Sequence, residues 1–255
     1  ALPLYEGRMI GQFDFSQKGW VSGKGRGAQW DGIDWANKCL LPQYLMSAGT
    51  FLNSSNYAPA PKASLIAIVS ATNTRGFICA PIPNHPCSHP VPVFRSDSGV
   101  LSFTLTQSAV LNSLVFDWCF RARLGSGVMY VSPYLLNESP IPSIIQNHVV
   151  NISGICASIA LCNQVFAVEW LSLTSPRFQV DSALRPISQW AIANMERLRL
   201  RCVLDALITA QFNLRASDFE WVLRECDNQG VSLQRELEAG ALSQKGFWRV
   251  DKDKD

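Results

Sequence analysis

Short apolar runs, broken by glycine, proline, asparagine and serine, fill residues 1–150 and predict strands joined by loops. Residues 64–70 (SLIAIVS) and 76–81 (GFICAP) are predicted to be two strands joined by the turn at 72–75. Residues 99–106 alternate between apolar and polar side chains, which predicts a further strand. The first part of the chain is therefore expected to form a β-sheet.

Further along the chain the spacing of apolar residues changes to three and four, which predicts helices. The first covers about 107–123 and ends at the glycines of Gly125-Ser126-Gly127. The segment Pro140-Ile141-Pro142 marks a break, and from there to about Cys226 the pattern is helical. We therefore predict an α+β fold, with a mixed β-sheet domain over residues 1–142 and a mainly α-helical region over 143–255.

The longest predicted helix runs from about Ser188 to Phe212. Apolar residues lie along one side of it, and its polar face carries Arg197, Arg199 and Arg201. A second helix is predicted to start at Ser217, where the serine hydroxyl and Glu220 fit a capping box.

The most apolar stretch, residues 152–173, is long enough to be considered as a membrane span. It contains Asn163, Gln164 and Glu169 and has no basic residue before its start, so a buried amphipathic helix is the preferred prediction. The polar opening of the chain does not fit a signal peptide, and its eight cysteines include no C-x-x-C pair. We therefore expect a reduced, cytoplasmic protein.

The amino-acid composition narrows the classes of protein to which this chain can belong. A hydrophobic share of 47% with 16% charged residues excludes a chain that is disordered throughout, and a net charge of +2 excludes a strongly polybasic protein. The charge is uneven, because residues 1–75 hold seven basic and four acidic side chains, whereas 201–255 hold eight basic and ten acidic. The chain opens at Ala1 without an initiator methionine, which favours a segment or a processed chain.

No complete catalytic motif is found. A nucleotide- or cofactor-dependent enzyme is expected to carry a glycine-rich loop directly after a strand, but Gly23–Gly27 (GKGRG) follows no strand-like run. There is no Asn-Pro-Pro-Tyr motif. The chain has three histidines, so it offers few candidates for the histidine of a Ser-His-Asp triad. We therefore predict no catalytic residue in this chain.

One cluster contains residue types that bind zinc, namely Cys79, His85, Cys87 and His89 within eleven residues. Their spacing matches no common zinc module, and alternate prolines stiffen the same segment. A proline-rich connection between strands is the preferred interpretation over a metal site, and no metal is predicted.

Several segments, in order along nearly the whole chain, resemble the C-terminal half of large adenine-specific DNA methyltransferases. These are the single-chain type IIG restriction-modification enzymes and the related phage-defence proteins of the BREX and DISARM systems. The opening 3–14 (PLYEGRMIGQFD) is similar to the family segment PLYEGKMIHQFDHR, and 71–75 (ATNTR) resembles TNERT. The segment 111–117 (LNSLVFD), with Gly125 to Gly127 after it, resembles the family's NSxxFD…GG helix, and Glu138 to Pro142 its LPxP turn.

The C-terminal part of the chain resembles the same family of DNA methyltransferases. Residues 197–206 and 218–227 resemble the pattern RxxLRAxLDA…DFxWILRDCD, and 245–252 (KGFWRVDK) is similar to a segment near the end of such chains. The chain departs from the family pattern at Arg8, Gly11 and Phe15, where lysine, histidine and a basic residue are usual. In the family, the motifs for S-adenosylmethionine and for catalysis lie N-terminal to the YEG segment. The resemblance thus implies that the cofactor belongs to a domain absent from this chain, which should be inactive alone.

The function that the resemblance implies is recognition of double-stranded DNA, so that a flipped adenine reaches the catalytic domain for N6 methylation. Such recognition needs cations for phosphates and polar side chains that read base edges. The first candidates form a glycine-rich basic run interleaved with tryptophans: Arg8, Lys18, Lys24 and Arg26. A solvated surface loop is the alternative for this run.

Further candidates lie at the ends of predicted elements. Arg75 stands at a strand turn, where a DNA contact is favoured over a structural ion pair. Arg121 and Arg123 end a helix, where cations also stabilise the helix dipole, and the backbone amides around Ser126 could approach a phosphate. An alternative function is a protein-interaction module, in which the helical region from about 143 docks a helicase or another subunit of a defence complex.

Overall fold

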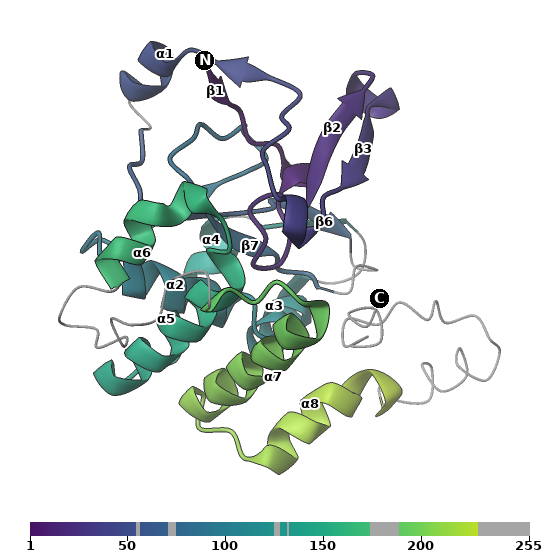
Figure 1. Ribbon diagram of the computed structural model, residues 1–255. Helices are drawn as coiled ribbons and strands as arrows, with labels where there is room; N and C mark the ends of the chain where they lie inside the picture. The colour runs from purple at the N-terminus through teal and green to yellow at the C-terminus, as the bar shows by residue number, and fades with distance from the viewer. Residues whose placement is uncertain (55–56, 71–74, 125–127, 132, 174–188, 229–255) are drawn as a thin grey trace.

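The protein combines small β-sheets with a group of helices, as the computed structural model in Figure 1 shows. The structure describes residues 1–54, 57–70, 75–124, 128–131, 133–173 and 189–228. The hairpin β2–β3 projects at the end of the molecule that carries the N-terminus, and helices α5, α7 and α8 lie at the opposite end. The predicted α+β class is confirmed.

The strands pair in four small sheets, and every strand pairing in the described part is antiparallel. Strands β1 (Leu2–Pro3) and β4 (Leu45–Met46) pair, as do β2 (Lys18–Ser22) and β3 (Gln29–Gly32). The largest sheet has the order β7–β5–β8, made of Cys79–Ile82, Lys62–Leu65 and Val93–Phe94. The last pair is β6 (Ile68–Ser70) with β9 (Val128–Tyr130).

The predicted strand at 64–70 is in fact two strands with different partners. Its first half belongs to β5, which pairs with β7, whereas its second half is β6, which pairs with the distant β9. The sequence between them, Ile66 and Ala67, still makes backbone hydrogen bonds, to Ile78 and Pro90. The two predicted strands therefore do pair with each other over Ser64 and Leu65, whereas Ile68 to Ser70 pair instead with a strand from beyond the first helices.

The described residues form eight α-helices, of which α1 lies between β4 and β5 and α2 and α3 precede β9. They are α1 (Ala48–Leu52), α2 (Leu101–Leu111), α3 (Leu114–Leu124), α4 (Pro133–Asn137), α5 (Gln146–Ala160), α6 (Ala167–Leu173), α7 (Asn194–Gln211) and α8 (Ala216–Asn228). Four short 3-10 turns complete the structure: η1 (Gly7–Met9), η2 (Gly25–Gly27), η3 (Trp35–Asn37) and η4 (Gln164–Phe166).

The strand predicted at 99–106 is wrong, because these residues begin helix α2. Almost every residue of α2 is buried, since the helix packs against β5 and β7 on one side and against α5 on another. A helix that is covered on several sides has no single apolar stripe. The serines and threonines of α2, which are polar but mostly buried, were therefore mistaken for the solvent-facing side of a strand. Ser108 satisfies its hydroxyl inside the helix by donating to the Thr104 carbonyl at 2.8 Å.

The helix predicted at 107–123 is interrupted at Asn112 and Ser113, where α2 ends and α3 begins. Ser113 Oγ accepts from the backbone N–H of Phe116 at 3.2 Å, which is the ordinary bond of a helix N-cap. The apolar stretch 152–173 is likewise divided into α5 and α6, with Asn163 accepting from the Val165 N–H at the break. No helix in the described parts of the chain is long and apolar enough to cross a membrane.

The two C-terminal helices start at other residues than predicted. Helix α7 begins at Asn194, because the backbone of Ala191 instead bonds to Ser158 of α5 at 2.8 Å. Helix α8 begins at Ala216, and the Asp218 carboxylate accepts from the Arg215 N–H at 2.9 Å. The capping residues are therefore Arg215 and Asp218, two positions before the predicted capping box at Ser217 and Glu220.

One hydrophobic core connects the sheets to the helices. Phe77 packs edge-on against Phe116 and Phe120, with ring centroids 5.2 and 5.4 Å away. The same core cluster includes Ile159 of α5 and Ile208 of α7. The predicted domain boundary after residue 142 stays a prediction, but the core is formed from residues on both sides of it.

Candidate nucleic-acid interface

A cavity of about 1030 Å³ lies among the N-terminal segment, the β2–β3 hairpin, β6 and α7. We call it the basic cleft, because five cations line it against two carboxylates. The cations are Arg8, Lys18, Arg75, Arg197 and Arg201, and the carboxylates are Glu6 and Asp14. Aromatic side chains line it as well: Trp30, Trp35 and Tyr44.

Three of the predicted DNA-binding residues are brought together here. Arg8 and Lys18 are exposed, and Arg8 reaches the hairpin by donating to the Ala28 carbonyl at 3.2 Å. Lys24 and Arg26 are exposed on the turn of the hairpin, and Gly25 between them lines the cleft. The basic run is therefore a surface structure beside a cavity, as a phosphate-binding segment requires.

Arg75 forms the structural ion pair that was the alternative to a DNA contact, and the DNA contact itself stays a prediction. It lines the cleft, but it is only 8% exposed and its guanidinium lies 3.9 Å from the carboxylate of Asp205 in α7. Asp205 also accepts from the Leu114 N–H at 2.7 Å, so the ion pair is part of the packing of α3 on α7. Burial raises the pKa of Asp205, and the nearby Arg75 opposes that rise.

The remaining predicted residues are not placed in the cleft. Arg121 and Arg123 belong to the last turn of α3, where their backbone is described. Their side chains, and the whole of Ser126, lie outside the described residues.

Two cleft residues were missed by the sequence prediction, which assigned Arg197 and Arg201 to the solvated face of a helix. Both point from α7 toward the cleft, and Arg201 donates to the Gln12 side chain at 3.2 Å. Arg199, on another face, is the exposed residue and pairs with Glu196 at 2.7 Å. A spacing of four places Arg197 and Arg201 together on one helix face, and this was the signal that could have separated them from Arg199.

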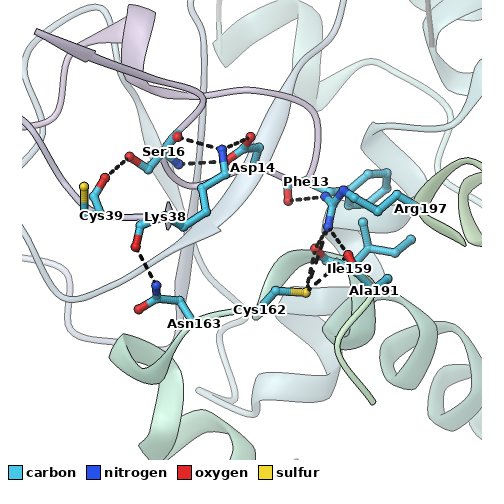
Figure 2. A network of polar contacts seen from close by, with 10 residues as sticks. All are labelled: Phe13, Asp14, Ser16, Lys38, Cys39, Ile159, Cys162, Asn163, Ala191 and Arg197. Atoms are coloured by element: carbon cyan, nitrogen blue, oxygen red, sulfur yellow. Dashed lines mark hydrogen bonds and ion pairs between the residues drawn. The ribbon is translucent and has the colours of Figure 1, made fainter. Parts of the chain in front are cut away.

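Arg197 connects three parts of the chain at the inner wall of the cleft, as Figure 2 shows. Its guanidinium donates to the carbonyls of Ile159 at 2.6 Å and Ala191 at 2.9 Å, and more weakly to Phe13 at 3.5 Å. It also lies 3.5 Å from the ring centroid of Trp35, a cation–π contact. Burial lowers the pKa of Arg197 to about 10, so the residue remains charged at neutral pH.

The charge of Asp14 is compensated within the protein. Its carboxylate lies 2.6 Å from Lys38 Nζ, which also donates to the Ser16 carbonyl at 2.8 Å (Figure 2). The Lys38 backbone in turn accepts from the Asn163 side chain at 2.9 Å, joining this pair to the helical region. Burial lowers the pKa of Lys38, and Asp14 opposes this by stabilising the charged amine. With Asp14 neutralised, the cleft has an excess of positive charge.

The residues of the NSxxFD-like segment hold the strand that follows Arg75. Asn112 accepts from the Cys79 N–H at 3.1 Å and donates to the Cys79 carbonyl at 2.9 Å. Asp117 accepts from the Phe77 N–H at 2.7 Å. The side chains of Asn112 and Asp117 thus bond to the buried backbone of the strand. By holding this strand, they position the edge of the cleft where Arg75 lies.

The cluster of potential zinc ligands does not gather around one point. Among the described residues, no group of three or more histidine, cysteine, aspartate or glutamate side chains is suited to hold a metal. Cys79 is buried against the Ser108 carbonyl, and burial raises its pKa. Burial also raises the pKa of Cys87 to about 12.

Comparisons with protein-family models, with curated proteins and with solved structures find no match to this chain.

Proposed function

We propose that this chain binds double-stranded DNA and serves as the target-recognition region of an adenine-specific DNA methyltransferase. The observation that carries the proposal is the convergence of Arg8, Lys18, Arg75, Arg197 and Arg201 on one cleft. Arg75 and Arg197 are held by contacts within the protein, to Asp205 and to backbone carbonyls. Arg8, Lys18 and Arg201 bring further positive charge to the same cavity, and such an excess of cations attracts a polyanion.

The two sides of the cleft suit different tasks. The hairpin side offers the exposed cations Arg8, Lys18, Lys24 and Arg26, which can follow phosphates from outside the cavity. The inner wall is fixed by the buried Arg197 and is lined by aromatic rings. Phosphate contacts position a nucleic acid, whereas groups deeper in the site can reach bases.

The enzyme class comes from the family resemblance and not from the cleft. By that resemblance, S-adenosylmethionine binding and methyl transfer belong to a domain N-terminal to the PLYEG segment. The part assigned to this chain is to hold and orient DNA for that domain, in a restriction-modification or phage-defence system.

The proposal is tested by measuring the affinity of the chain for a random-sequence duplex over a salt series, using fluorescence anisotropy. Four phosphate contacts give a log–log slope of about −3.6, so the affinity falls about 150-fold between about 50 and 200 mM salt. Lys18→Ala and Arg26→Ala are each expected to make the slope shallower by about 1. Arg95→Ala is the matched control, because Arg95 is exposed but does not line the cleft.

Two results contradict the proposal. The first is binding that does not depend on salt, and the second is an equal loss of affinity in Arg95→Ala and in the cleft variants. Either result means that the cations of the cleft do not contact phosphates.

A further inference from the structure

Two large apolar side chains stand exposed and opposite each other on the small β6–β9 sheet. Ile68 of β6 is 56% exposed and Tyr130 of β9 is 48% exposed, and the two are direct partners in the antiparallel register. Direct partners have their side chains on the same face of a sheet, with Cβ atoms about 4.5–5.5 Å apart. We call Ile68 and Tyr130 the apolar pair.

The apolar pair lies at the wall of the basic cleft, on the face of the sheet that is turned away from the core. Ile68 lines the cleft, whereas the next residue, Val69, is 4% exposed and belongs to the hydrophobic core. Successive side chains of a strand point to opposite faces. Ile68 therefore points away from the core at the cleft wall, and Tyr130 lies beside it on the same face. Single exposed apolar residues are ordinary on a protein surface, but these two are adjacent and border a cavity.

Cations lie close to this face of the sheet. A Cβ atom at Gly7 would stand 3.6 Å from Ile66 Cγ2, so the 3-10 turn η1 packs against the segment that leads into β6. The second residue of η1 is Arg8, which is exposed and lines the cleft, and Lys18 of β2 is exposed and lines the same cavity. An apolar surface bordered by cations suits a ligand that combines flat apolar rings with negative charge.

Nucleotides with unpaired bases have this combination of groups. In proteins that bind single strands, bases stack on aromatic side chains while cations follow the phosphate backbone. In an intact duplex the faces of the bases are covered by their neighbours in the stack, and only the base edges are open in the grooves. Isoleucine and tyrosine side chains offer no match for the hydrogen-bonding pattern of an edge, but they can cover a base face. The apolar pair therefore suits a base that has left the paired stack.

We propose that Ile68 and Tyr130 form a stacking platform for an unpaired base, so that the basic cleft binds DNA with unpaired bases more tightly than fully paired DNA. This inference rests on the proposed DNA-binding function and adds to it the form of DNA that the cleft prefers. The Tyr130 ring and the Ile68 side chain cover the face of the base, while Arg8 and Lys18 hold the neighbouring phosphates. Electrostatic attraction alone does not give this preference, because paired and unpaired sites of equal length carry the same number of phosphates.

The test compares two duplexes of equal length and charge by fluorescence anisotropy. One is fully paired, and the other has a short run of thymine–thymine mismatches at its centre. The chain is expected to bind the mismatched duplex about tenfold more tightly, which is within the range measured for one base stacked on an aromatic side chain. The ratio of the two affinities is the quantity followed in the variants.

Variants of the apolar pair separate stacking from other causes of a preference. Tyr130→Thr removes the ring but keeps a residue suited to a strand, and it is expected to bring the ratio close to one. Tyr130→Phe keeps the ring and is expected to keep the ratio, whereas Ile68→Thr lowers the ratio by itself. The matched control is Tyr134→Ala, because Tyr134 is 68% exposed and does not line the cleft, and it leaves the ratio unchanged. Thermal melting followed by circular dichroism verifies that each variant is folded.

Each outcome decides between the two proposals. Equal binding of the two duplexes by the unmodified chain, with salt-dependent binding intact, overturns the stacking platform and leaves the DNA-binding proposal standing. A preference that Tyr130→Thr and Ile68→Thr leave unchanged overturns it too, because it then comes from the flexibility of mismatched DNA. Self-association of the chain that Ile68→Thr abolishes, without any change in the ratio, means that a second copy of the chain covers the apolar pair instead. The absence of binding to either duplex is the failure of the proposed function itself.

Discussion

Two of the buried cations, Arg197 and Lys62, have backbone carbonyls as their main partners. Arg197 donates to the carbonyls of Ile159 and Ala191, and Lys62 donates to those of Ala58 and His85 at 3.0 and 2.9 Å. A cation bound in this way connects loops that have no regular structure and satisfies their carbonyls at the same time. Burial lowers the pKa of both residues.

This use of carbonyls explains why Arg197 was assigned wrongly from the sequence. A carboxylate partner leaves a signal in the sequence, as Glu196 and Arg199 do at a spacing of three. A carbonyl partner leaves none, because every residue has one. The cations of the N-terminal run could be predicted as surface groups, since glycines around them prevent burial among large side chains.

Asn112 permits a test at the scale of one side chain. It is buried, and its amide satisfies both backbone groups of Cys79 and the Ser108 carbonyl. Asn112→Ala leaves these groups unpaired, and we expect the free energy of unfolding to fall by about 3 kcal/mol. Urea denaturation measures this change. Asn37→Ala, at an exposed position, is the control and is expected to change stability by less than about 0.5 kcal/mol.

A drop of less than about 1 kcal/mol in Asn112→Ala contradicts this role, because it means that water or a rearranged strand replaces the amide. Asn112→Asp provides a second measurement. It keeps an acceptor for the Cys79 N–H but removes the donor for the two carbonyls, so we expect it also to destabilise the fold.

At the scale of elements, local capping leaves a signal in the sequence that the prediction of one helix over 107–123 missed, whereas pairing between distant strands leaves none. The break between α2 and α3 has its own signal, because Ser113 caps the N–H of Phe116. The separation of β5 from β6 has none, because it depends on β9, almost sixty residues further along the chain. Helix α2 was mistaken for a strand for the same reason, since its burial on several sides comes from β5, β7 and α5.

The β2–β3 hairpin turn depends on one glycine more than on its neighbours. Gly23 has φ of +78°, and a Cβ atom there would collide with the Gly27 carbonyl oxygen. Gly27 has no positive φ, and a Cβ atom there meets no other atom within 4 Å. Of these two positions, only Gly23 therefore requires glycine for steric reasons; Gly25 between them has a φ of +56° but open space around a Cβ atom.

We expect Gly23→Ala to destabilise the closed hairpin by about 2 kcal/mol, and Gly27→Ala to have little effect. Hydrogen exchange at the Ile33 amide, which is bonded to the Gln17 carbonyl at 3.0 Å across the base of the hairpin, reports its opening. Because Lys24 and Arg26 lie on this turn, Gly23→Ala is also expected to weaken duplex binding. Equal exchange rates in both variants contradict this explanation.

At the scale of the whole molecule, the β-rich part and the helical part depend on each other. Helix α2 packs against α5, and Asp205 of α7 accepts from the first N–H of α3. The basic cleft crosses the same division, with Arg8 and Lys18 on one side and Arg197 and Arg201 on the other. If the cleft is the DNA site, recognition needs both parts and cannot be separated from the helical region.

This dependence predicts how a shortened chain behaves. Residues 1–142 alone expose the face of α2 that α5 covers and lack the buried residues Ile159, Leu204 and Ile208 of the core. We expect such a fragment to lose its near-ultraviolet circular dichroism and to show no cooperative thermal transition, and its affinity for duplex to fall to that of a flexible basic segment. Co-expression with residues 143–255 is expected to restore both properties. A fragment 1–142 that melts sharply and binds DNA as the full chain does would instead establish two independent domains, with a cleft that functions without α7.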